Sequence, residues 1–330
     1  MRSSIAVEEG IATMRTKGAK TLQGIIPILV TPFDAEYRID EESLANLVEF
    51  NIDAGVHGLG VALGSEIFKL SESERRQLVR AVIDAVGGRV PVVVNSSAAG
   101  TALAVLYAAD AEEEGADALM VHPPHFMPVG AAEILEFYRT VDAAVSIPIV
   151  LQDIPQAPIP PSLAIRIAEI CPNARYIKVE NPPVATRVWE MVAAVGSRLG
   201  VFGGAGGTYF IEELRRGAVG TMPFCSQPAA FVDVLELFGS GDETGARKLF
   251  QKAIMPVNHL AMQGGDVFYH IHKSMLVRQG ILRGAAVLGP TTPIDSITKT
   301  EIETLLADLF PTAQAFGTWN ADPNKPRALA

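Results

Sequence analysis

Short apolar runs alternate with longer amphipathic stretches along the chain from Gly24 onward. Eight runs have the length of β-strands, and several are apolar without interruption, which is typical of parallel strands covered by helices. They span residues 25–30, 58–62, 90–94, 118–121, 148–151, 175–179, 199–202 and 218–222. The pattern therefore predicts a strand followed by a helix, repeated eight times.

Capping residues mark the ends of the stretches between these runs. Ser71, with Glu74 three positions later, has the spacing of a capping box at a helix start. The amphipathic stretch 101–114 ends at Gly115, and Pro161 suits a first helical turn. Eight strand–helix units predict an α/β fold, the closed TIM (β/α)8 barrel, with a doubly wound parallel sheet as the competing arrangement.

Helical patterns continue beyond the eighth unit, over 242–263, 266–279 and 298–310. In the last of these, Thr298 and Glu301 have capping-box spacing. The two ends of the chain are rich in small and polar residues. We expect an N-terminal tail (1–23), the barrel (24–240), a C-terminal helical extension (241–310) and a C-terminal tail (311–330).

Composition and charge limit the partners and the cellular location that are expected for this protein. The 330 residues include 27 Lys and Arg against 37 Asp and Glu, for a net charge of −10. A net anion is not attracted by nucleic acid or by anionic membrane lipids, so neither is expected as a partner. Cys171 and Cys225 make no disulfide framework, and no apolar run has transmembrane length or the form of a secretory signal. We expect a cytoplasmic protein.

Lys178 is the most informative polar residue, because it lies near the end of the sixth apolar run. The period of two in a strand places Tyr176, Lys178 and Glu180 on one face. Barrel enzymes work at the C-terminal ends of their strands, and desolvation there favours the neutral amine that attacks carbonyls. The alternative is a structural ion pair with Glu180 or Asp153, whereas a catalytic Glu180 would shuttle protons.

Three other strand ends carry candidate groups. The backbone N–H groups around Gly64 and the Ser65 hydroxyl suit a carboxylate ligand, with an ordinary loop as the alternative. The glycine-rich stretch 203–207 either cradles a phosphate or leaves room for substrate, and its lack of a basic residue favours the second. His122 and His125 flank two prolines without a Cys or carboxylate cluster, so we expect loop-shaping residues and no metal.

The chain resembles the dihydrodipicolinate synthase / N-acetylneuraminate lyase family of Schiff-base-forming barrels over about residues 24–310. The motifs that carry the resemblance occur in the family's order and at matching spacing. They are Gly24-Ile-Ile-Pro27 with Val30-Thr-Pro-Phe33, Glu66 with Leu70-Ser-Glu-Ser-Glu-Arg75, Gly115-Ala-Asp-Ala118 leading to Pro123-Pro124, Ile154-Pro155, and Ile177-Lys178. The resemblance implies that Lys178 forms the imine.

Departures from the family pattern bear on the reaction. Gln152, which cannot titrate, stands where the family usually has a proton-relaying tyrosine. Ala157 stands where many synthases place an arginine, and the paired threonines of the second loop fall on Leu63 and Gly64. Synthesis of dihydrodipicolinate is therefore not expected.

The chain has a glutamate two residues after the lysine and lacks the proton-relaying tyrosine. In both respects it resembles the family's dehydratases of 2-keto-3-deoxy sugar acids. The resemblance implies conversion of L-2-keto-3-deoxyarabonate to 2,5-dioxopentanoate by a homotetramer. No cofactor is expected, because the lysine itself supplies the electron sink. A pyruvate-forming retro-aldol lyase and a non-catalytic barrel that binds a sugar acid remain alternatives. The expected site comprises Lys178 and Glu180 as catalytic residues, with Gly64, Ser65, His125, Gln152 and Gly204 at the substrate.

Overall fold

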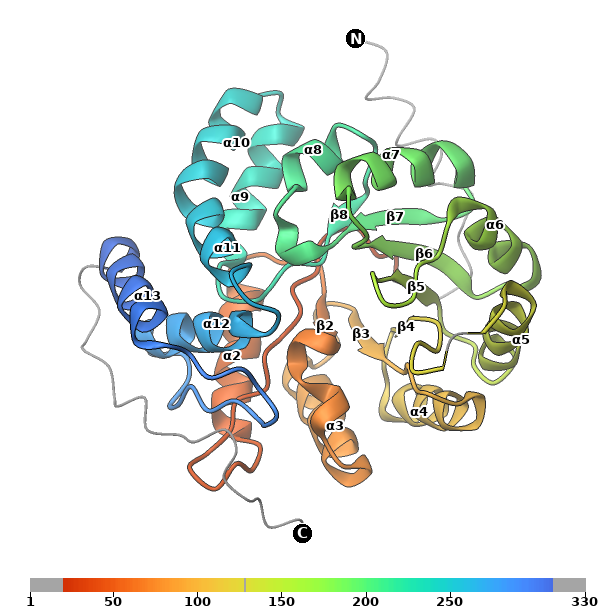
Figure 1. Cartoon of the computed structure of the whole chain (residues 1–330), viewed down its shortest axis with the longest axis horizontal. Helices are drawn as coiled ribbons and strands as arrows, with labels where there is room; N and C mark the ends of the chain where they lie inside the picture. Colours follow the sequence, from red (N-terminus) through yellow and green to blue (C-terminus); the bar gives the residue numbers. More distant parts are fainter. Residues whose placement is uncertain (1–19, 128, 311–330) are drawn as a thin grey trace.

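The computed structural model describes residues 20–127 and 129–310. Eight parallel strands follow one another in the order β1-β8-β7-β6-β5-β4-β3-β2. A parallel bridge between Ile28 and Gly60 joins the first strand segment to the second and completes the ring. Helices surround the strands (Figure 1). The TIM barrel predicted from the alternation is confirmed, and the doubly wound sheet is excluded.

The elements have the following bounds. The strands are β1 (Gly24–Ile25), β2 (Leu59–Val61), β3 (Val92–Asn95), β4 (Ala118–Val121), β5 (Ile149–Asp153), β6 (Ala174–Val179), β7 (Gly200–Gly203) and β8 (Gly220–Thr221). The barrel helices are α2 (Glu41–Asp53), α3 (Glu72–Val86), α4 (Thr101–Glu114), α5 (Ala131–Asp142), α6 (Pro161–Ile170), α7 (Val184–Val195), α8 (Phe210–Leu214) and α9 (Pro228–Gly239). The helices after the barrel are α10 (Glu243–Leu249), α11 (Met255–Ala261), α12 (Val267–Arg278) and α13 (Ser296–Leu309).

Side chains alternate between two cores, as the period of two predicts. Inward-facing residues fill the centre of the barrel, where Val93, Met120, Val150 and Phe202 pack together. Their neighbours along each strand, such as Val201 on β7, belong to the larger core between strands and helices. This alternation fixes the side of the strand on which each polar residue at a strand end emerges.

The first strand is shorter than its apolar run predicts. We expected a strand over 25–30, but β1 ends at Ile25. Pro27 has no N–H to donate, so regular pairing stops there. Its carbonyl still accepts a hydrogen bond from the Gly60 N–H at 2.8 Å, and Ile28 bridges to both Gly60 and Phe224. The run therefore closes the barrel through isolated contacts.

The end of the predicted N-terminal tail packs against the bottom of the barrel. Leu22 is buried in the central core, and its N–H donates to the Tyr176 hydroxyl at 3.1 Å. Residues 1–19 and the predicted C-terminal tail (311–330) lie outside the described residues.

The helical extension differs in two places from the predicted helices. A π-helical turn at Phe250–Ile254, just before Pro256, separates α10 from α11 where one continuous helix was expected. The expected start at Thr298 is wrong, because Asp295 caps α13 by accepting from the Ile297 and Thr298 N–H groups. The capping box at Ser71 and Glu74 is present as predicted.

Glu213 on α8 is a fully buried carboxyl group behind β7. Neither of its oxygens has a hydrogen-bond partner within the described chain. Its side chain lies so close to Gly203 that a Cβ atom there would collide with it. Burial, helped by the carboxylates of Glu212 and Glu180 and opposed by Lys178, raises the pKa of Glu213 to about 8.

This pKa predicts a pH-dependent stability. Between the ordinary value of 4.5 and about 8 the folded state holds a proton that the unfolded state has lost, so stability falls as pH rises. Glu213→Gln should remove this dependence and stabilise the protein above pH 8 by at most about 5 kcal/mol. Urea unfolding at pH 5 and pH 8 measures the effect, with Glu303→Gln, an exposed glutamate on α13, as the control. A gain that is equal at both pH values would contradict the prediction.

Candidate active site

A cavity of about 420 Å³ opens at the C-terminal ends of the strands. Most of its lining is apolar, and polar side chains reach it at only a few points. From the barrel come Gly64, Gln152, Lys178 and Glu180, all of which the sequence singled out. Such a hollow with a few polar groups is the usual form of a small-molecule site.

Lys178 and Glu180 form an ion pair inside this cavity. Lys178 Nζ lies 3.1 Å from Glu180 Oε1, with the two side chains 5% and 19% exposed. Gln152 lies beside Lys178 on the neighbouring strand, and its Nε2 donates to Glu180 Oε2 at 2.8 Å. Gln152 on β5, Lys178 on β6 and Glu180 directly after β6 thus form one connected cluster on the cavity wall.

The ion pair is compatible with both roles considered for Lys178, a structural partner of a carboxylate and a catalytic amine. Both members line an open cavity and not a packed interior, so both are accessible to a ligand. Asp153, the other candidate partner, accepts hydrogen bonds from the Ile159 N–H and from the Asn181 side chain instead. Lys178 is therefore left with a single carboxylate partner, Glu180, in the described part of the chain.

The Glu180 carboxylate is held in its ionised form. Burial alone would raise its pKa. The Lys178 ammonium and hydrogen bonds from Gln152, Lys178 and the Ala205 N–H outweigh burial, so the pKa of Glu180 is lowered. A carboxylate that is ionised at neutral pH is able to accept a proton.

Glycines 203 and 204 make room for two carboxyl groups. A Cβ atom on Gly204 would collide with the Glu180 side chain, just as one on Gly203 would collide with Glu213. The Ala205 N–H donates to Glu180 Oε1 at 3.2 Å. Gly206 lines the cavity itself. The glycines thus accommodate protein carboxyls as well as leaving space in the site, and Gly204 supports Glu180 from behind without lining the cavity.

The turn after β2 presents its backbone to the cavity. Leu63 and Gly64 line the cavity, whereas Ser65 is 1% exposed and does not. The Ser65 hydroxyl donates to the Leu29 carbonyl at 2.5 Å and accepts from the Ala62 N–H at 3.1 Å. In this structure Ser65 therefore holds the turn in place, and the group offered to a ligand is the backbone at Gly64.

The histidine loop after β4 does not reach the cavity. His125, which follows the two prolines, is exposed and is not among the residues that line the cavity. His122 is buried, and its Nδ1 contacts the Pro123 carbonyl at 2.8 Å. Burial lowers the pKa of His122 against the opposing effect of that carbonyl. The structure thus places His125 away from the substrate site where we expected it.

The helical extension contributes residues that the sequence did not reveal. Asn258 on α11 and Phe268 on α12 line the cavity, together with Thr208 from the loop after β7. The Asn258 Nδ2 donates to the Gly206 carbonyl at 3.0 Å and contacts the Thr208 hydroxyl at 3.2 Å. A buried Asn within an apolar helix is the one signal that could have identified this contribution.

Within residues 20–127 and 129–310, no group of three His, Cys, Asp or Glu side chains is arranged to hold a metal ion. No helix in the same part of the chain is long and apolar enough to span a membrane.

Known proteins are similar to this chain in sequence and in fold. Residues 21–309 match the Dihydrodipicolinate synthetase family. L-2-keto-3-deoxyarabonate dehydratase of Azospirillum brasilense is 30% identical over 297 residues, or 88% of this chain and 95% of the relative. 4-hydroxy-tetrahydrodipicolinate synthase of Rhizobium meliloti is 32% identical over 243 residues, or 72% and 82% of the two chains.

Among solved structures, the dihydrodipicolinate synthase of Rhodopseudomonas palustris has a TM-score of 0.79 at 26% identity and covers 87% of this chain and 97% of its own. A putative dihydrodipicolinate synthetase from Pseudomonas aeruginosa has a TM-score of 0.80 at 27% identity, with 88% and 100% covered. Family match, identity and barrel agree over nearly all of the described residues. The chain belongs to the dihydrodipicolinate synthetase family and is a lyase of that family.

Proposed function

We propose that the protein is a Schiff-base dehydratase that converts L-2-keto-3-deoxyarabonate to 2,5-dioxopentanoate. The observation that carries this proposal is the cluster of Lys178, Glu180 and Gln152 in a cavity that none of the chain's six tyrosines lines. Similarity to the Azospirillum brasilense dehydratase supports the same reaction. The homotetramer implied by the family resemblance and the cytoplasmic location expected from the sequence stay predictions.

The reaction begins at Lys178. The Lys178 ammonium passes a proton to Glu180, 3.1 Å away, and the neutral amine attacks the C2 ketone. The hydroxyl of the resulting carbinolamine leaves as water with that proton, which gives a protonated imine, acidifies the C3 protons and returns Glu180 to its carboxylate form. Glu180, 3.1 Å from the lysine Nζ, is placed to remove one of them. The iminium keeps the positive charge that Glu180 faces in the free enzyme, so the carboxylate remains stabilised until it takes the proton.

The enamine then expels the C4 hydroxyl, and the proton gained by Glu180 leaves with it as water. The remaining C3=C4–C5 allylic alcohol then loses a proton from C5 and gains one at C3, which moves the double bond to C4=C5. The resulting enol loses its hydroxyl proton and gains a proton at C4, so that C5 becomes the aldehyde. Hydrolysis of the imine releases 2,5-dioxopentanoate and restores Lys178. The net change is the loss of one water molecule with all five carbons retained.

The turn at Gly64 binds the carboxylate of the substrate. Its backbone faces the cavity, while the Ser65 and Glu66 N–H groups are used within the turn, donating to the Ala62 and Leu63 carbonyls. Gln152, Thr208 and Asn258 are the neutral polar groups best placed for the substrate hydroxyls. An apolar cavity with such contacts suits a small sugar acid.

Retro-aldol cleavage is the second candidate, supported by the family's lyase activity. It requires a base on the C4 hydroxyl. Gln152 occupies the strand-5 position beside Lys178 and cannot serve as that base. Dehydration is therefore the reaction that these side chains support better.

Product analysis tests the choice between the two reactions. With L-2-keto-3-deoxyarabonate we expect a five-carbon dicarbonyl product and no pyruvate, and borohydride should trap the substrate on Lys178. Mass mapping of the labelled peptide locates the adduct, and Lys178→Ala should give none. Release of pyruvate with an aldehyde would establish cleavage, and failure to trap any 2-oxo acid would favour a binding protein.

Glu180→Gln should separate imine formation from elimination. We expect the turnover number to fall by about 10²–10⁴, because the group that removes the C3 proton is lost. Borohydride trapping should persist in part, since Lys178 remains in the cavity. Glu212→Gln, on α8 with a side chain 34% exposed, is the control. A near-wild-type rate in Glu180→Gln would remove Glu180 from the mechanism.

Gly204→Ala should damage the site by displacing Glu180, against whose side chain the new methyl group would press. A shift of about 1 Å in a catalytic group costs roughly 10²-fold in rate, so we expect a loss of that order. Gly100→Ala is the matched control, because a Cβ atom at Gly100 meets nothing within 4 Å. Steady-state kinetics of the two variants at equal folded fraction make the comparison, and equal rates would show that Gly204 is dispensable.

A further inference from the structure

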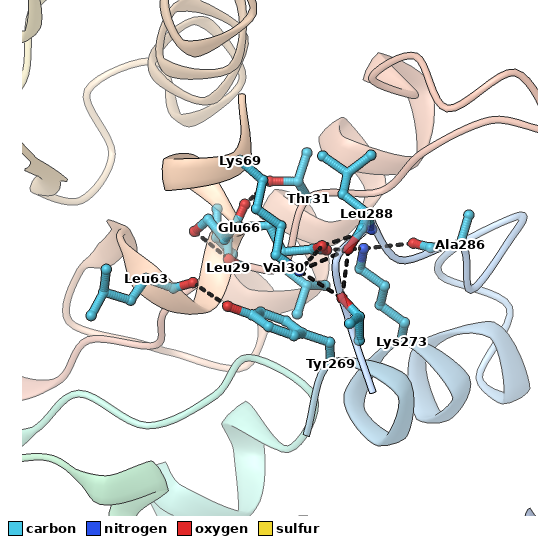
Figure 2. A network of polar contacts seen from close by, with 12 residues as sticks. Leu29, Val30, Thr31, Leu63, Glu66, Lys69, Tyr269, Lys273, Ala286 and Leu288 are labelled. Atoms are coloured by element: carbon cyan, nitrogen blue, oxygen red, sulfur yellow. Dashed lines mark hydrogen bonds and ion pairs between the residues drawn. The ribbon is translucent and has the colours of Figure 1, made fainter. Parts of the chain in front are cut away.

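Glu66, the residue directly after the Gly64–Ser65 turn, carries a fully buried carboxylate between two lysines. Lys273 Nζ on α12 lies 2.5 Å from Oε1, and Lys69 Nζ lies 3.4 Å from Oε2. The Leu288 N–H donates to Oε2 at 2.8 Å. Figure 2 shows these contacts converging from the barrel and from the C-terminal extension.

Both lysines also hold the segment that follows α12. Lys273 Nζ donates to the Ala286 carbonyl at 2.6 Å. Lys69 Nζ donates to the Leu288 carbonyl at 2.8 Å and to the Thr291 hydroxyl at 2.7 Å. One carboxylate thus connects the loop after β2 with residues more than 200 positions later.

Further hydrogen bonds fix the turn itself. The Tyr269 hydroxyl on α12 donates to the Leu63 carbonyl at 2.7 Å (Figure 2). From the barrel side, the Thr31 hydroxyl donates to the Ser65 carbonyl at 2.5 Å. The turn that faces the cavity is therefore held between the segment that follows β1 and helix α12, with Glu66 at its end.

A contribution to the stability of the fold does not by itself explain this arrangement. Burying a lysine–glutamate pair gains little net free energy over apolar side chains of similar size. Glu66 also has a φ of 55°, in the left-handed region that a non-glycine residue seldom adopts. Burial lowers the pKa of Lys273, an effect that the Glu66 carboxylate opposes. What the network does supply is a fixed direction for the backbone at Gly64.

We propose that Lys273, acting through Glu66, is a positioning residue that orients the Leu63–Ser65 turn to bind the carboxylate of a 2-oxo acid. The inference rests on the proposed function, which assigns carboxylate binding to this turn. The C-terminal extension then sets affinity for the acid group, while Lys178 on β6 carries the chemistry. Loss of the Lys273 charge leaves Glu66 with only the more distant Lys69 as a cationic partner and releases the turn from α12.

The test compares two probes in borohydride trapping at Lys178. Pyruvate has a ketone and a carboxylate, whereas hydroxyacetone has the ketone alone. For Lys273→Met we expect half-saturation by pyruvate to rise about tenfold or more, with hydroxyacetone changed less than about twofold. A change confined to the acid is one that general loosening of the fold would not produce.

Arg283→Met is the control, because it breaks another ion pair between the extension and the barrel. Arg283 binds Asp40 at the start of α2, on a different element from the turn. Both probes should trap on this variant as on wild type, within about twofold. The double variant Glu66→Gln/Lys273→Met leaves no unpaired carboxylate, so it provides a folded protein if the single variant is unstable, and pyruvate should still bind weakly.

Several results overturn the inference. It fails if Lys273→Met shifts both probes equally, if Arg283→Met reproduces the pyruvate effect, or if the double variant binds pyruvate like wild type. If wild-type protein traps no 2-oxo acid on Lys178, the proposed function itself fails and the inference with it. Trapping by wild type with any of the first three results refutes the positioning role alone.

Discussion

The ion pair between Lys178 and Glu180 is the interaction on which the candidate site depends. Two charged groups on the wall of an apolar cavity must be paired, because an isolated buried charge is strongly disfavoured. Here the partner that keeps Glu180 ionised is also the amine that the chemistry requires. Gln152 and the Ala205 N–H complete the carboxylate's hydrogen bonds without adding a competing charge.

The end of β7 shows how backbone composition serves this pair. Gly203 and Gly204 have carboxyl groups pressed against opposite faces of the same short segment, Glu213 from the helix side and Glu180 from the cavity side. A side chain at either position would displace one of them. The glycine-rich stretch, which suggested a phosphate cradle as one alternative, is better explained by these two contacts and by the cavity that follows them.

The C-terminal extension is part of the site and more than a cover for the barrel. Asn258 and Phe268 form cavity wall, while Lys273 and Tyr269 bind the turn opposite. Its own apolar core, which includes Ile271, anchors these side chains. The barrel supplies the reacting groups, and the extension closes the space around them.

The periodicity of apolar residues in the sequence was sufficient to predict much of the fold. The alternation of apolar runs predicted eight strands and their order, and the period of two placed Lys178 and Glu180 inside the barrel mouth, because strand geometry is local. Local rules also placed the Ser71 cap, but they selected the wrong residue for the last helix, where the nearby Asp295 is the cap in place of Thr298.

Only the tertiary structure could decide which polar groups share the cavity. His125 is exposed and does not line the cavity, and the Ser65 hydroxyl makes its hydrogen bonds within the protein. Asn258, on a helix after the barrel, does line the cavity. The Glu66–Lys273 pair joins residues 207 positions apart, and no periodic pattern encodes such a contact. Spacing along a chain specifies the face of an element, whereas the partner across a gap depends on how the elements pack.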